Sequence, residues 1–145
     1  MCYSAVMPEP LKHQSFRLPA SLLDRVRTAA ERRGTSQTAL VQRLIDEGLR
    51  MEEHPLIVFR DSVLGRRAML AGSRLEVAHV VDTARYSETL EEVAEYFRRG
   101  LHEVQACLQY YAEYQDEVDA YMAAKDEESE RLRLLWEREQ ALLAG

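Results

Sequence analysis

Residues 12–18 alternate between polar and apolar side chains, and this short segment limits what the chain can fold into. Phe16 and Leu18 fall on one face of a strand, while His13, Ser15 and Arg17 fall on the other. A lone strand of this length leaves half of its backbone hydrogen-bonding groups without partners and buries only one face. The segment therefore predicts a strand that must pair outside its own unit.

Two helical segments follow this strand. Pro19 ends the strand, and apolar residues recur at helical spacing over residues 20–33. Gly34 is the residue expected just past a helix end, and Thr35 and Ser36 supply the hydroxyl caps of a second helix. A unit of residues 12–50 is too small to enclose its own core. It predicts a two-fold dimer in which two strands pair antiparallel above four helices.

The charge of the chain is distributed unevenly. The formal net charge is −6, which by itself argues against binding to nucleic acid. Residues 12–43 nevertheless hold seven basic and two acidic side chains, whereas residues 111–145 hold four basic and ten acidic ones. A basic beginning and an acidic end indicate two partners of opposite character.

The first fifty residues resemble the Arc/MetJ type of ribbon-helix-helix repressor. The resemblance covers about residues 12–50 and rests on four stretches: Phe16-Arg17-Leu18-Pro19, Leu23-Asp24-x-Val26-Arg27, Ala30-Glu31-x-x-Gly34-x-Ser36 and Gln42-Arg43. It implies a homodimer that binds double-stranded operator DNA, because the major groove admits a two-stranded ribbon.

The resemblance also implies roles for single residues. It assigns base reading to three polar residues of the ribbon, which are His13, Ser15 and Arg17. It assigns phosphate contacts to Lys12 and to the helix start, which comprises Thr35, Ser36 and Gln37. His13 departs from the residues usual at its position. Thr35 and Ser36 act as helix caps in either case, and Arg17 could be an ordinary solvated strand residue.

The second half predicts a small domain over residues 56–110, after a linker at residues 51–55. Strands are expected at residues 56–60 and 67–70, and three helices follow them. The first helix covers residues 77–84, the second ends at residue 97, and the third begins at about residue 102. This stretch is similar to a family of small bacterial domains of unknown function with a winged-helix-like fold. The similarity rests on Gly65, Gly72, Ser73, Arg74, Val77 and Val80, whereas Ala68 stands where that family has proline.

Domains of this family often occur in antitoxins encoded beside PIN-like nuclease toxins, and the resemblance therefore implies an antitoxin. Arg74 is a possible second DNA contact. The alternative is that Arg74 anchors its turn to a carboxylate such as Asp61 or Asp82, because the surrounding half of the chain is acidic. The helices of this domain could equally form a second dimerisation surface.

The acidic tail, residues 111–145, is the candidate toxin-binding element. Leu132, Leu135 and Trp136 lie at helical spacing, with Trp136 as an aromatic anchor. Arg131, Arg133 or Arg138 could pair with the metal-binding carboxylates of a PIN-like nuclease. The alternative is a solvated helix that packs on its dimer mate.

These observations predict a mainly α-helical chain with short β elements. It comprises a flexible arm at residues 1–11, a ribbon-helix-helix domain at 12–51, a winged-helix-like domain at 56–110 and a long helical tail. The predicted function is an antitoxin and repressor of its own operon. The alternative is a stand-alone repressor whose second domain binds a ligand or assembles dimers. We expect no enzyme activity, cofactor or metal, a buried Cys107 and a cytoplasmic location, since no signal peptide or membrane span is evident.

Overall fold

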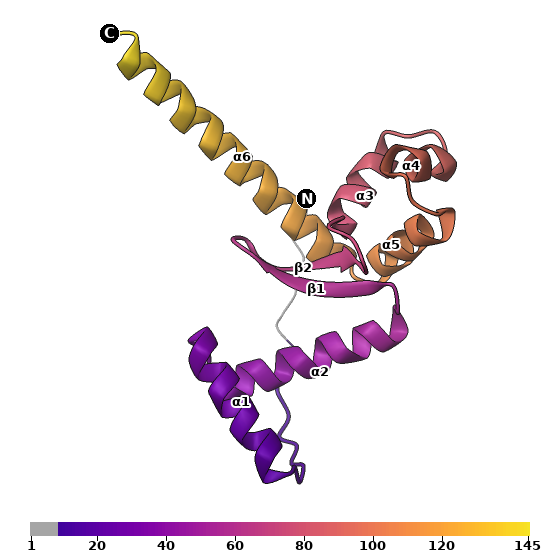
Figure 1. The fold of residues 1–145 in the computed structure, drawn as a ribbon, viewed down its shortest axis with the longest axis vertical. Helices are drawn as coiled ribbons and strands as arrows, with labels where there is room; N and C mark the ends of the chain where they lie inside the picture. Colours follow the sequence, from indigo (N-terminus) through magenta and orange to yellow (C-terminus); the bar gives the residue numbers. More distant parts are fainter. Residues whose placement is uncertain (1–8) are drawn as a thin grey trace. The chain divides into compact units, whose positions relative to one another are not determined.

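A computed structural model describes residues 9–145 (Figure 1). Over these residues the chain forms six helices and one two-stranded antiparallel hairpin. It divides into two compact units, one ending at Arg43 and the other spanning Leu44 to Gly145, and the boundary falls inside a helix. Most of the predicted arm lies outside the described residues. The mainly helical class with a long carboxyl-terminal helix is confirmed.

The first unit contains the predicted helix, turn and helix start. Helix α1 spans Ala20–Arg33 and ends at Gly34, which adopts the left-handed conformation with φ 63° and ψ 33°. The Ser36 hydroxyl then accepts the amide hydrogen of Ala39 at 3.0 Å and caps helix α2, which spans Gln37–Glu53. Gly34 is suited to this turn because it lacks the Cβ that makes such a conformation costly. The predicted span of the first helix and the predicted start of the second are confirmed.

The predicted strand at residues 12–18 is absent from the single chain that the structure describes. Phe16 is 70% exposed and Leu18 is 42% exposed. A strand exists only where a second strand accepts and donates its backbone hydrogen bonds, and one copy provides no such strand for these residues. The predicted ribbon between two copies therefore stays a prediction.

The second unit begins with the last part of α2 and continues into a hairpin. Strand β1 spans Ile57–Ser62 and strand β2 spans Gly65–Leu70, with Ile57 opposite Leu70. Both predicted strands are confirmed. The predicted linker at residues 51–55 is wrong in part, because α2 continues to Glu53. Glu52 and Glu53 are good helix formers, so the helix continues through them. It ends before His54, because Pro55 disfavours the helical conformation of the residue that precedes it.

Three short helices follow the hairpin. Helix α3 spans Val77–Arg85, α4 spans Leu90–Phe97 and α5 spans Leu101–Glu113. Thr89 caps α4 in a reciprocal capping box with Glu92. The three predicted helices of this region are confirmed. Their buried faces form one apolar core, in which the largest fully buried side chains from the three helices are Val77, Val80, Val93, Val104, Cys107 and Tyr110.

Helix α6, Gln115–Leu143, has two parts with different surroundings (Figure 1). Val118 is buried in the core of the second unit, and Tyr121 and Met122 pack against that core. Residues 129–145 are all exposed. The start of the acidic tail thus belongs to the folded unit, and only its far half extends away from it. No helix of the described part of the chain has the length and apolar character of a membrane span.

Cys107 offers a direct test of this core. Its side chain is fully buried, and burial raises the pKa of the thiol to about 12. We expect a Cys2→Ser variant, in which Cys107 is the remaining thiol, to react with a disulfide reagent only after unfolding in denaturant, since the thiolate is the reactive form. Rapid reaction of the native variant, measured by absorbance, would contradict this packing.

Candidate functional site

The predicted base-reading residues lie in one exposed segment ahead of α1. His13, Ser15 and Arg17 are all exposed, as is Lys12. The apolar side chains of Phe16 and Leu18 are exposed in the same segment. The segment thus presents both its polar and its apolar side chains to solvent. Its apolar side chains are therefore accessible to a strand of a second copy, which could cover them.

The start of α2 holds the predicted phosphate contacts. Thr35, Ser36 and Gln37 are exposed there, and the Ser36 carbonyl accepts the amide hydrogen of Leu40 at 3.1 Å. The first amides of a helix lack partners within the helix, and the Ser36 hydroxyl satisfies that of Ala39. The predicted capping is confirmed for Ser36.

Arg74 has an exposed side chain on the turn between β2 and α3. Ser73 anchors this turn, because its hydroxyl donates to the Leu70 carbonyl at 2.8 Å and accepts the Leu75 amide hydrogen at 3.1 Å. Asp61, one of the carboxylates expected to hold Arg74, pairs with Arg66 at 3.1 Å. Within residues 9–145 the guanidinium of Arg74 makes no ion pair, so it does not serve as the anchor of the turn.

The predicted toxin-binding residues lie together on the exposed half of α6. Leu132, Leu135 and Trp136 share one face at i, i+3 and i+4 spacing, and Trp136 is 60% exposed. Arg131 already pairs with Glu128 at 2.6 Å, so it would have to exchange this carboxylate for one on a partner. Arg138 is exposed on the same half of the helix.

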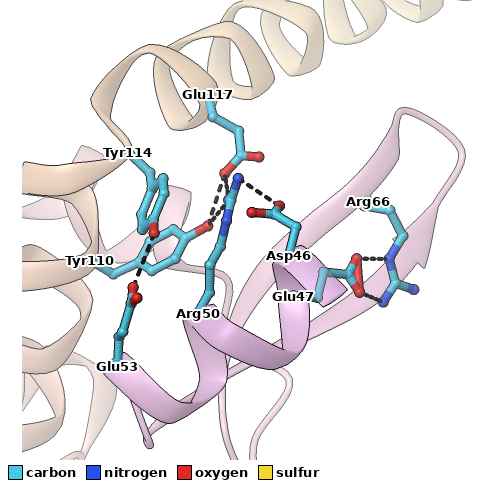
Figure 2. A network of polar contacts seen from close by, with 8 residues as sticks. All are labelled: Asp46, Glu47, Arg50, Glu53, Arg66, Tyr110, Tyr114 and Glu117. Atoms are coloured by element: carbon cyan, nitrogen blue, oxygen red, sulfur yellow. Dashed lines mark hydrogen bonds and ion pairs between the residues drawn. The ribbon is translucent and has the colours of Figure 1, made fainter. Parts of the chain in front are cut away.

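A polar network around Arg50 joins three helices of the second unit, as Figure 2 shows. The Arg50 guanidinium donates to the Tyr110 hydroxyl at 2.9 Å and to the Glu117 carboxylate at 2.7 Å. Tyr110 donates in turn to Glu117 at 2.8 Å, and Asp46 pairs with Arg50 at 2.9 Å. The network therefore connects the last turns of α2 with α5 and the start of α6.

Burial and hydrogen bonding together fix the protonation states of this network. Burial and the Glu117 carboxylate raise the pKa of the Tyr110 hydroxyl far above its usual value. Burial opposes the charge of Arg50, but hydrogen bonds to Tyr110 and Glu117 raise its pKa as well. The Arg50 guanidinium also stacks over the Tyr114 ring at 4.0 Å. Arg50 therefore stays charged and Tyr110 stays protonated at neutral pH, which suits a structural link.

A second ion pair ties α2 to the hairpin. Arg66 of β2 donates to both carboxylate oxygens of Glu47, each at 2.7 Å (Figure 2). Such a paired geometry is stronger and more directional than a single contact. Sequence reasoning missed both this pair and the Arg50 network, since their partners lie far apart in sequence and no local pattern indicates them.

Sequence reasoning also missed a group of potential metal ligands. His54 follows α2, and its Nε2 lies 3.1 Å from Oε2 of Glu113 at the end of α5. Together with Glu53 these residues bring three ligand atoms within 4.8 Å of one another. The spacing of the histidines and cysteines alone could not reveal this group, because two of its members are glutamates and one comes from a distant helix.

The Arg50 network predicts a specific loss of stability. We expect Arg50→Ala to lower the free energy of unfolding of the second unit by about 1–3 kcal/mol, because the fully buried Tyr110 loses a charged hydrogen-bond partner and Glu117 loses its counterion. Urea unfolding followed by circular dichroism measures this. Arg131→Ala, which removes an exposed pair on α6, is the matched control and should leave the transition unchanged. Equal curves for the wild type and Arg50→Ala would show that the network contributes nothing.

Comparison with curated proteins and with solved structures gives no match. A comparison with protein-family models gives a match to residues 57–111, which run from β1 to within two residues of the end of α5. This stretch coincides with the domain that the sequence predicts over residues 56–110. Residues 57–111 are therefore similar to the DUF433 family, which is described as a protein of unknown function.

Proposed function

We propose that this protein is a dimeric DNA-binding regulator whose reading surface lies in residues 12–43, and that it acts as the antitoxin of a PIN-like nuclease. The observation that carries the proposal is the exposed alternating segment at residues 12–18, followed by two helices joined at Gly34. This order of elements is that of a ribbon-helix-helix module, for which the strand of a second copy supplies the missing partner.

Exposed apolar side chains support the second copy. Besides Phe16 and Leu18, the side chains of Leu22 and Leu23 on α1 are exposed. Burial of one such side chain stabilises an association by roughly 1.5–3 kcal/mol. Two copies would contribute each of these residues twice, so their burial offers a substantial driving force for a two-fold dimer.

The polar face of the same segment supports DNA as the ligand. Pairing through Phe16 and Leu18 turns His13, Ser15 and Arg17 of both copies to the opposite face of the ribbon. Arg is the side chain that most often reads guanine in the major groove, and the seven basic residues of residues 12–43 supply attraction to phosphate. Thr35, Ser36 and Gln37 are proposed to hold the flanking phosphates. The role is regulatory rather than enzymatic.

Arg17→Ala tests the reading surface. We expect the full chain to bind DNA from upstream of its own gene, and the variant to bind it at least tenfold more weakly, since each paired base contact contributes about 1–3 kcal/mol. Fluorescence anisotropy with a labelled duplex measures both affinities at one fixed salt concentration. Arg60→Ala, an exposed arginine of β1, is the control and should bind like the wild type.

Two results would contradict this assignment. One is equal affinity of the wild type and Arg17→Ala, which would move the reading surface elsewhere, with Arg74 as the next residue to test. The other is an Arg60→Ala variant that loses as much affinity as Arg17→Ala, because a general effect of positive charge would then account for both.

The exposed half of α6 supports a protein partner. Its apolar face of Leu132, Leu135 and Trp136 is flanked by charged side chains, as in helices that enter an apolar groove of another protein. A nuclease of the PIN-like class binds metal ions through carboxylates. Arg131 and Arg138 are proposed to pair with these carboxylates while the acidic side chains of α6 face the basic surface around them.

Trp136→Ala tests the antitoxin role. We expect the variant to bind the neighbouring nuclease at least tenfold more weakly, since a buried aromatic anchor contributes about 2 kcal/mol or more. Its affinity for DNA should not change. Titration calorimetry with the purified nuclease measures the first effect, and Tyr86→Ala, another exposed aromatic residue, is the control. A wild-type chain that binds no nuclease would favour the stand-alone regulator instead.

A further inference from the structure

The carboxyl-terminal ends of α2 and α5 bring three potential metal ligands to one place in the second unit. Glu53 is the last residue of α2, His54 follows it, and Glu113 is the last residue of α5. Their ligand atoms lie within 4.8 Å of one another. The group differs from a common acidic surface cluster, because its central member is an imidazole that is almost fully buried.

Neighbouring side chains fix the position of this imidazole. The His54 side chain is only 9% exposed, and its Nε2 lies 3.1 Å from Oε2 of Glu113. The rings of Tyr110 and Tyr114 meet the His54 ring edge to face, with centroids 5.4 Å and 6.1 Å away. The ring is therefore held with Nε2 facing the carboxylate before any ligand arrives, which lowers the cost of binding.

The electrostatics at this point favour a cation. The carbonyl groups at the carboxyl end of a helix carry partial negative charge, and two such ends meet here with a glutamate on each. The Arg50 guanidinium, which stacks over the Tyr114 ring, is paired with Glu117 and Asp46, so its charge is already compensated. The Tyr114 hydroxyl donates to Glu53 at 3.4 Å and holds this second carboxylate near the histidine (Figure 2).

We propose that Glu53, His54 and Glu113 bind a divalent first-row transition-metal ion, with Zn²⁺ as the ion that fits best. Imidazole nitrogen and carboxylate oxygen are ordinary zinc ligands at about 2.0–2.2 Å, which places neighbouring ligand atoms of a tetrahedral site about 3.3 Å apart. The distance of 3.1 Å between His54 and Glu113 already matches this spacing. Glu53 is exposed, its carboxylate belongs to the same group of ligand atoms within 4.8 Å, and water completes the coordination.

Such an ion would have a structural role in the second unit. It would join the end of α2 to the end of α5 beside the Arg50 network and would replace the proton on Nε2 as the link between His54 and Glu113. The site is independent of the proposed DNA and nuclease contacts, since none of its ligands belongs to those sets.

Titration calorimetry of the full chain with ZnCl₂, after removal of metal by a chelator, tests the site. We expect one ion per chain with a dissociation constant in the micromolar range. His54→Ala should weaken binding at least tenfold. His79→Ala, which removes an exposed histidine of α3, is the matched control and should bind like the wild type.

Glu113→Gln keeps a hydrogen-bonding side chain next to His54 but removes a charged ligand. A loss of zinc affinity in this variant can therefore be distinguished from a loss of the folded structure. We expect this variant to bind Zn²⁺ at least tenfold more weakly and to have an unchanged circular dichroism spectrum. Equal zinc affinity of the wild type, His54→Ala and Glu113→Gln would overturn the proposal, as would the absence of binding to the wild type. In either case His54 and Glu113 would form a hydrogen-bonded pair and nothing more.

Discussion

A strand needs a neighbour, and this requirement governs how the amino-terminal unit can work. Within the described residues, the segment at 12–18 belongs to no sheet, and the apolar side chains of Phe16 and Leu18 face solvent. The two helices behind the segment bury only Ala30 and Leu40 among their side chains in the first unit. A single copy therefore leaves most of the apolar surface of this unit uncovered. The proposed dimer, and the DNA-binding ribbon within it, would supply the missing strand and cover this apolar surface.

The second unit, in contrast, buries an apolar core within a single copy of the chain, and a polar network lies beside this core. Arg50, Tyr110 and Glu117 hold the end of α2 against α5 and α6 through short hydrogen bonds. These contacts give the last turns of α2 a fixed place beside the matched residues, although the family match begins only at residue 57. The folded unit is thus larger than the matched domain, and it includes residues on both sides of it.

The helices and strands could be predicted because local sequence patterns indicate them. No local pattern indicates the contacts between elements that are distant in sequence. Gly34, Ser36 and the apolar spacing of α3 indicate helix ends and faces directly from the sequence. The acidic tail predicts one or two exposed amphipathic helices, yet Val118 packs in the core because the break at Tyr114 turns the start of α6 back onto it. Arg50 lies at the end of the predicted ribbon-helix-helix unit and His54 lies in the predicted linker, and their partners are about sixty residues away.

Amide hydrogen exchange over residues 12–18 of the full chain tests the central claim most directly. If two copies pair through this segment, alternate amides should exchange slowly, and their protection should decrease on dilution as the dimer dissociates. Phe16 and Leu18 would then be shielded while the side chains of His13, Ser15 and Arg17 stay accessible. Fast exchange of every amide in the segment at all protein concentrations would contradict the account, because no ribbon could then exist to read DNA.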